Sequence, residues 1–167
     1  TLTDSKGCIT DTTFGIMDNL SIFAEISSKT DVTCNGNDDG TATVTVYNGT
    51  PPYTYKWVKG PTTTEIPDAT NVDMSPGTYY VTVTDQAGCQ VRDSVFINEP
   101  AKVNVSVAVN NVTCFGGNNG TVVAHATGGT GVYTFYLNGI YSGDSVFNNL
   151  VANNYVVVAE DQNKCGA

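Results

Sequence analysis

Residues 31–41 and 111–121 are two versions of one segment, DVTCNGNDDGT in the first copy and NVTCFGGNNGT in the second. The copies start 80 positions apart, and two later segments recur in the same order: residues 52–57 return at 132–137, and residues 79–89 return at 155–165. Self-similarity of this kind is the sequence signature of tandem modules. The chain is therefore expected to fold as copies of one unit, and its function should be one that duplication serves.

Aligning the copies predicts where the modules begin and end. Residues 1–8 match the sequence around 83–89, so residues 1–19 are interpreted as the C-terminal tail of a preceding repeat. Residues 20–100 form a complete repeat, and residues 101–167 a second repeat that lacks its last strand. The sequence is accordingly interpreted as a window on a longer protein.

The charge balance narrows the class of partner. The chain has 167 residues with 16 acidic and 7 basic side chains, a formal net charge of -9. Such a surface repels nucleic acid and anionic lipid. No apolar run is long enough to span a bilayer, so no membrane insertion is expected. A hydrophobic content of 40% is nevertheless compatible with two small packed cores.

Alternating side chains predict an all-β fold. Ala42, Val44 and Val46 alternate with threonines, and three aromatic residues alternate in 53–57. Similar patterns occupy 79–83 and 91–97, with Gly, Pro, Asn and Asp between the segments. No stretch has a helical period. Short alternating strands separated by turn residues predict an immunoglobulin-like β-sandwich for each repeat, and the repeats are expected to form a linear array.

The five cysteines occupy only two positions of the module, which favours disulfides in an exported protein over a zinc site. Pairing within each repeat would join Cys34 to Cys89 and Cys114 to Cys165, and would leave Cys8 to a partner upstream. The alternative joins Cys8 to Cys34 and Cys89 to Cys114. The first arrangement is favoured because each copied unit would then carry its own bond. In an immunoglobulin topology, however, the two positions lie at opposite ends of the sandwich, which would permit bonds between neighbouring repeats.

Three segments have the composition of a ligand site. Residues 35–40 contain Asp38 and Asp39, the expected ligands if calcium binds, but they lack the spacing of an EF-hand. A turn is the favoured interpretation of this segment. His125 lies in an alternating strand with no nucleophile and acid arranged around it, so we expect no catalytic residue. Residues 128–131 are rich in glycine but lack the Lys and Ser/Thr of a phosphate loop.

The aromatic side chains have two interpretations. Alternation places Tyr53, Tyr55, Trp57 and Tyr79 on buried faces, where core packing is favoured over stacking on sugars. Four other tyrosines are the candidates for an outward position, and thus for carbohydrate contact: Tyr47, Tyr80, Tyr136 and Tyr141.

Together, residues 31–41, 52–57, 76–89 and 97–100 closely resemble the SprB repeat, found in very long surface adhesins of gliding bacteria. The resemblance is weaker over 101–165 and covers 1–19 as a tail. It implies a non-enzymatic, extracellular segment of an adhesin that is exported and moved along the cell surface. The implied partners are neighbouring repeats and a substratum or surface polysaccharide. Sequences resembling bacterial O-glycosylation sites place acceptors at Thr12, Ser94 and Ser145.

Two other functions remain open at the level of sequence. One is a carbohydrate-binding or calcium-binding extracellular module, with no cofactor other than calcium. The other is a repeat appended to a secreted enzyme, whose catalytic domain would lie outside these residues.

Overall fold

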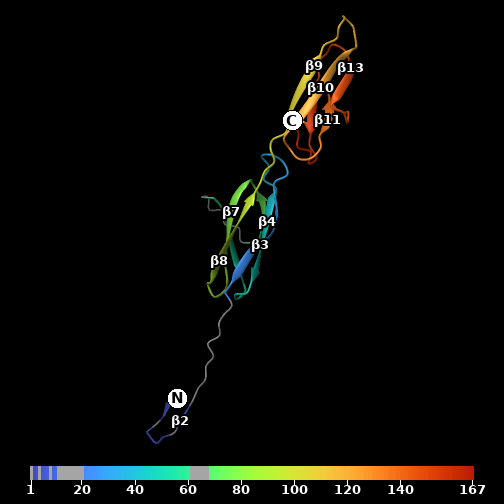
Figure 1. Cartoon of the computed structure of the whole chain (residues 1–167). Coiled ribbons are helices and arrows are strands. Elements are labelled where there is room, and N and C mark those ends of the chain that lie inside the picture. Colours follow the sequence, from blue (N-terminus) through green and yellow to red (C-terminus); the bar gives the residue numbers. More distant parts are fainter. Residues whose placement is uncertain (1, 4, 8, 11–20, 61–67) are drawn as a thin grey trace.

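The computed structural model describes residues 2–3, 5–7, 9–10, 21–60 and 68–167, and every regular element in them is a strand (Figure 1). The all-β prediction is therefore confirmed. The strands are β1 (Leu2–Thr3), β2 (Ile9–Thr10), β3 (Phe23–Thr30), β4 (Gly40–Tyr47), β5 (Thr54–Lys59), β6 (Thr70–Met74), β7 (Gly77–Thr84), β8 (Gln90–Ile97), β9 (Asn104–Asn110), β10 (Gly120–Thr127), β11 (Thr134–Leu137), β12 (Ile140–Tyr141), β13 (Val146–Leu150) and β14 (Val157–Glu160). β1 and β2 pair as an antiparallel hairpin. The described part of the chain contains no helix that could cross a membrane.

The first module is a sandwich of two three-stranded antiparallel sheets, ordered β3-β4-β6 and β5-β7-β8. β4 alternates buried and partly exposed residues along its length because one face lies on the core. Val81 and Val83 of β7 are fully buried, and Trp57 of β5 is 1% exposed. The indole Nε1 of Trp57 donates to the carbonyl of Asp68 at 3.0 Å. Of the four aromatic residues predicted for the core, Trp57 and Tyr79 are buried, and Tyr53 and Tyr55 are partly buried against it.

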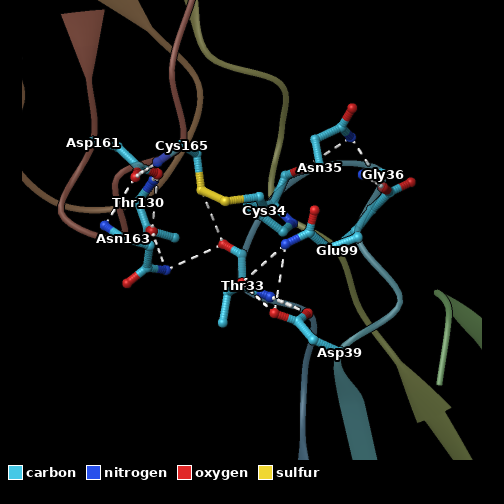
Figure 2. The surroundings of a disulfide bond; sticks show 12 residues. Thr33, Cys34, Asn35, Gly36, Asp39, Glu99, Thr130, Asp161, Asn163 and Cys165 are labelled. Atoms are coloured by element: carbon cyan, nitrogen blue, oxygen red, sulfur yellow. Dashed lines mark hydrogen bonds between the residues drawn. A yellow bond between two sulfur atoms is a disulfide. The ribbon is translucent and has the colours of Figure 1, made fainter. Parts of the chain in front are cut away.

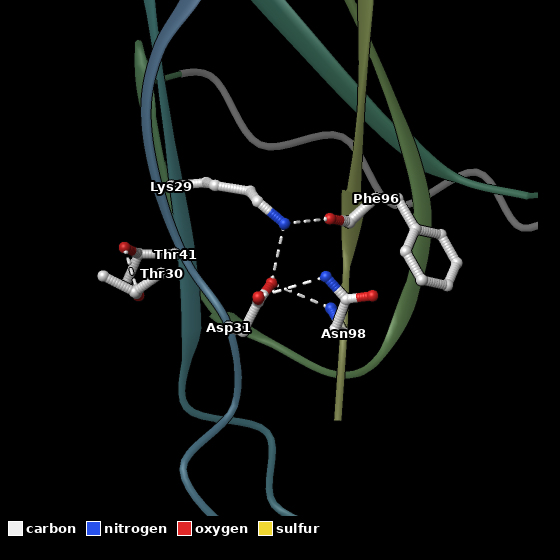
Figure 3. A network of polar contacts seen from close by, with 6 residues as sticks. All are labelled: Lys29, Thr30, Asp31, Thr41, Phe96 and Asn98. Atoms are coloured by element: carbon white, nitrogen blue, oxygen red, sulfur yellow. Dashed lines mark hydrogen bonds and ion pairs between the residues drawn. The ribbon is translucent and has the colours of Figure 1, made fainter. Parts of the chain in front are cut away.

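β3 and β8 belong to different sheets but lie along the same edge of the sandwich, and polar side chains tie them together. The amide of Ile26 donates to Asp93 Oδ2 at 2.8 Å. Beyond the strand ends, Asp31 accepts from Lys29 Nζ at 2.8 Å and from the backbone amide of Asn98 at 2.9 Å (Figure 3). Lys29 also donates to the carbonyl of Phe96. These contacts close one side of the first module.

The second module repeats this plan with sheets ordered β13-β10-β9 and β12-β11-β14. Its core is built on Val122, Ala124, Ala126, Phe135, Phe147 and Ala159. Register places Leu137 where the first module has Trp57, and Phe147 where it has the buried Asn71. The two cores therefore exchange a large residue for a smaller one at two positions, in opposite directions.

In the second module, Gly166 and Ala167 take the place of the start of β8. Gly166 bridges Glu160 as Gln90 pairs with Thr84 in the first module, and Ala167 exchanges backbone hydrogen bonds with Ala159. In the first module Ile97 of β8 is fully buried, and its side chain would lie 2.8 Å from a Cβ placed on Gly40. Near the corresponding Gly120 there is instead an apolar groove of about 260 Å³.

The two modules lie end to end, and the C-terminus returns to the junction between them (Figure 1). β4, β5, β7 and β8 fall where alternation predicts strands. Sequence patterns did not predict β3, whose one fully buried residue is Ala24, or β6, in which only Asn71 and Met74 are buried. Both strands lack the period of two from which a half-buried strand is recognised.

Candidate functional site at the junction between the modules

Three segments meet where the first module ends and the second begins: the loop 31–39 after β3, the linker 98–103, and the turn 161–165 after β14. A disulfide joins Cys34 of the loop to Cys165 of the turn, with the two Cα atoms 5.5 Å apart (Figure 2). The bonded residues are 131 positions apart in sequence and belong to different modules. This junction is thus held together covalently as well as by the chain itself.

The loop that carries Cys34 is shaped by its own side chains. Asp39 Oδ1 accepts from the amide of Thr33 at 2.9 Å, and Asp39 Oδ2 accepts from the Thr33 hydroxyl. These bonds hold the pKa of Asp39 below its usual range, with the hydroxyl contact as the largest cause. The backbone amide of Asn37 donates to the backbone carbonyl of Cys34. Gly36 has a φ of 84°, a left-handed backbone conformation that favours glycine. The Asn-, Asp- and Gly-rich segment thus presents the cysteine at the end of the sandwich.

The turn that carries Cys165 is organised around one buried carboxylate. Asp161 is 3% exposed and accepts from the amides of Thr130, Asn163 and Cys165 at 2.8–2.9 Å. Burial by itself raises the pKa of Asp161, but these hydrogen bonds together hold it below its usual value. Since the Cys165 amide is one of the donors, the carboxylate sets the position of the cysteine that crosses the junction.

The linker is attached to both modules. On the first, Glu99 Oε2 accepts from Asn35 Nδ2 at 3.0 Å and from the amide of Gly36 at 3.1 Å (Figure 2). On the second, the carbonyl of Ala101 accepts from the amide of Gly129 at 2.7 Å. Val103 is 3% exposed. The linker therefore adds hydrogen bonds to both modules beside the disulfide.

The favoured prediction for the cysteines is wrong. The structure joins Cys34 to Cys165, and leaves Cys89 and Cys114 unpaired and exposed among the described residues. Cys89 lies in the turn that bonds to Thr50 at one end of β4, whereas Cys34 precedes the other end. Eight strand residues separate those ends by roughly 26 Å, whereas disulfide Cα atoms lie about 4–7 Å apart. The same separation keeps Cys114 from Cys165, and Cys8 lies outside the described residues.

The other candidate residues are dispersed. No group of three or more His, Cys, Asp or Glu side chains gathers around a common point in the described residues. Asp39 is engaged with Thr33, and Asp38 is exposed. Of the proposed glycan acceptors, Ser94 is exposed and Ser145 half-buried, and Thr12 lies outside the described residues. Calcium binding and glycosylation therefore stay predictions.

The candidate residues on the strands differ in how far their side chains are exposed. His125 lies on the exposed face of β10, and Tyr47, Tyr80 and Tyr141 are about half or more exposed. Tyr136 is half-buried and donates from its hydroxyl to Glu160 Oε2 at 3.1 Å. Sequence reasoning missed Asp161, Asn163 and Glu99. Their positions in the copied motifs were visible, but nothing in the sequence showed which of them would face a neighbouring module.

Comparison with known families gives an independent result. The family model of the SprB repeat matches residues 26–62 and 106–140. Each matched segment includes the Cys-bearing loop and the two strands that follow it. A search of curated proteins found no match. Two segments of the chain, one in each module, therefore match the SprB repeat, a repeat module of gliding-motility-type adhesins.

Proposed function

We propose that this chain is a non-enzymatic, extracellular segment of a surface adhesin, whose repeats form a filament that carries a binding region away from the cell. The observation that carries the proposal is the Cys34–Cys165 bond, because it joins two modules rather than bracing one. Disulfides persist in oxidising surroundings such as the cell surface. A covalently closed junction transmits tension without letting the modules separate.

The linker supports the same function. Glu99 contacts the first module, and the backbone of Ala101 contacts the second, so the connection is ordered over its length. The net charge of -9 opposes association between neighbouring filaments and keeps them soluble. These properties suit a spacer, and they require no catalytic group.

The proposal is tested in the cells that make the protein. An antibody raised against residues 21–167 is expected to label intact cells, and an in-frame deletion of that segment is expected to reduce attachment to glass. A strain with Cys165→Ser is the matched control for the junction, since it keeps every module. Labelling only after permeabilisation would exclude a surface filament.

A second function is favoured by a groove on the outer face of the β5-β7-β8 sheet. This groove of about 440 Å³ is lined by Lys56, Val58, Tyr80, Thr82, Gln90 and Arg92. Tyr80 is 51% exposed and offers a ring face for a sugar, and the basic side chains suit an acidic saccharide. Calorimetry with acidic oligosaccharides should then show binding that Tyr80→Ala removes and Tyr47→Ala, on the other sheet, leaves unchanged.

Calcium binding at Asp38 and Asp39 is a further proposal for the loop of the junction. A cation there would compete with the Thr33 hydrogen bonds to Asp39. Calcium is therefore expected to shift the amide resonances of residues 33–39, and Asp38→Asn should weaken that shift. Equal shifts with and without Asp38 would exclude this site.

A further inference from the structure

Cys89 and Cys114 are exposed and unpaired, yet each stands in a position that is bonded in the other module. Cys89 occupies the place of Cys165, in the turn before the last strand. Cys114 occupies the place of Cys34, in the loop after the first strand. The chain thus contains one complete junction. It also contains a second, unbonded turn cysteine, Cys89, and a second, unbonded loop cysteine, Cys114, at the ends of the modules that face away from that junction.

The turn around Cys89 has the geometry of the bonded turn around Cys165. Asp85 is 5% exposed and accepts from the amides of Thr50 and Cys89 at 3.0 and 2.8 Å. The corresponding distances from Asp161 to the amides of Thr130 and Cys165 are 2.8 and 2.9 Å. In both turns the aspartate amide donates to the cysteine carbonyl at 3.0 Å. The bonded shape is therefore already present at Cys89 without a partner.

The loop around Cys114 is equally prepared. Asn119 Oδ1 accepts from the amide of Thr113 at 3.1 Å, as Asp39 accepts from that of Thr33. The amide of Gly117 donates to the carbonyl of Cys114 at 2.9 Å, as that of Asn37 donates to the carbonyl of Cys34. The loop thus holds its thiol in the conformation used at the complete junction.

A second observation points to a covering partner at Cys114. Phe115 follows it and is completely exposed. The counterpart of Phe115 is Asn35, whose side-chain amide donates hydrogen bonds to Glu99 and to the carbonyl of Pro100 in the linker. An exposed phenylalanine at this position would lie against the proline of an incoming linker, where a ring contact replaces the amide hydrogen bonds.

We propose that Cys89 and Cys114 are the bonding sites for further copies of this module, with one disulfide at each junction. The loop cysteine of each module joins the turn cysteine of the module that follows. Cys114 therefore accepts a copy that presents a turn cysteine, and Cys89 accepts a copy that presents a loop cysteine. In the resulting array a disulfide joins neighbouring modules at every junction. This property goes beyond the proposed role as a surface spacer.

Bond formation proceeds by exchange with a small disulfide such as oxidised glutathione. The thiolate of one cysteine attacks that disulfide, forms a mixed disulfide and releases one glutathione thiolate. The thiolate of the other cysteine then attacks the mixed disulfide and releases the second glutathione. Two protein thiols lose two protons and two electrons, and one glutathione disulfide is reduced.

An in-register extension of the chain tests the proposal. Gly166 and Ala167 stand in register with Gln90 and Val91, so residues 92–167 can be appended after Ala167 to complete the second module and add a third. Cys114→Ser is introduced in the appended copy alone. The extended chain is oxidised in a glutathione buffer, alkylated and digested with trypsin. Cleavage at lysine and arginine places Cys34, Cys89 and Cys114 in separate peptides, and distinguishes both copies of Cys165 by mass.

The expected map contains Cys34 linked to the first Cys165 and Cys114 linked to the appended Cys165, with Cys89 alkylated. The unextended chain is the control, in which Cys114 should be alkylated. Alkylated Cys114 in the extended chain, or its linkage to Cys89 or to the first Cys165, would overturn the proposal. The map is independent of where the protein resides, so it can fail while the proposed function stands.

A second measurement uses the unextended chain and does not depend on the fusion. Variants Cys8→Ser/Cys89→Ser and Cys8→Ser/Cys114→Ser are oxidised separately and as a mixture. We expect Cys89–Cys114 heterodimers to make up well over half of all disulfide-linked dimers in the mixture, whereas random pairing would make them half. A random share, or no heterodimer, would contradict complementary bonding sites.

Discussion

Asn163 of the second module donates from Nδ2 to the carbonyl of Thr33 in the first module, at 3.2 Å. The same amide donates to Thr130 Oγ1 at 3.0 Å, so one side chain bridges the modules beside their disulfide. The first module has Ala87 at the corresponding position of its own turn. A junction formed at Cys89 would therefore lack this hydrogen bond and depend more on its disulfide and linker.

Breaking the junction disulfide should release the modules from one another. In Cys165→Ser we expect the two modules to reorient independently, which lowers the anisotropy of rotational diffusion measured by 15N relaxation. The strands of each module should keep their chemical shifts, because the bond braces neither sandwich internally. Cys89→Ser removes an unpaired cysteine in the equivalent turn and should leave the anisotropy unchanged. Equal anisotropy in Cys165→Ser would show that Asn163 and the linker hold the modules unaided.

Replacing Asp161 by Asn should destabilise the second module by about 1–3 kcal/mol, since a buried amide nitrogen then faces backbone donors. Urea denaturation at pH 7 measures this loss. The pKa of Asp161 is lowered in the folded state, so its contribution is present above the pKa of the unfolded chain and is lost as pH falls. The difference between wild type and Asp161→Asn should therefore shrink in acid. A difference that is constant with pH would contradict a role for the charge.

Acid should also weaken the edge of the first module. Hydrogen bonds from Lys29 and Asn98 lower the pKa of Asp31 from 3.8 to about 2. Because the folded pKa is the lower one, this stabilisation is present above the unfolded pKa of 3.8 and is lost progressively as pH falls through the folded pKa of about 2. The carboxylate is 42% exposed, so the effect should not exceed about 1 kcal/mol. Asp31→Asn should flatten the acid limb of the stability curve, and NMR titration of the Asp31 carboxyl provides the pKa directly.

The two modules differ at two core positions, Trp57 and Asn71, and we expect substitutions at these positions to compensate for one another. Trp57→Leu should cost the first module about 2–4 kcal/mol, since it leaves a cavity and an unpaired carbonyl at Asp68. Asn71→Phe alone should overpack the same core. We expect the double variant, which copies Leu137 and Phe147, to be more stable than the sum of the single changes predicts. Thermal unfolding of the wild type, the two single variants and the double variant gives the coupling energy. Strictly additive changes in stability would show that the side chains at the two positions do not fill a common part of the core.

Much of the fold was predictable because its signals are local. Alternation identified β4, β5, β7 and β8, and the aspartate before each turn cysteine was visible in the repeated motif. β3 escaped prediction because Ala24 is its one fully buried residue. The buried Asn71 of β6 likewise interrupts the apolar pattern from which a strand is recognised.

The sequence alone determined the module, its repetition, the strands β4, β5, β7 and β8, and the two positions that carry cysteine, because copied motifs and a period of two are properties of order along the chain. It did not determine which cysteines meet. That depends on where the ends of β4 and β10 lie in space, and therefore on how two sheets stack and how the linker sets one module on the next. Tertiary structure decided that Cys34 bonds to Cys165, because the ends of a sandwich are too far apart to be joined within it.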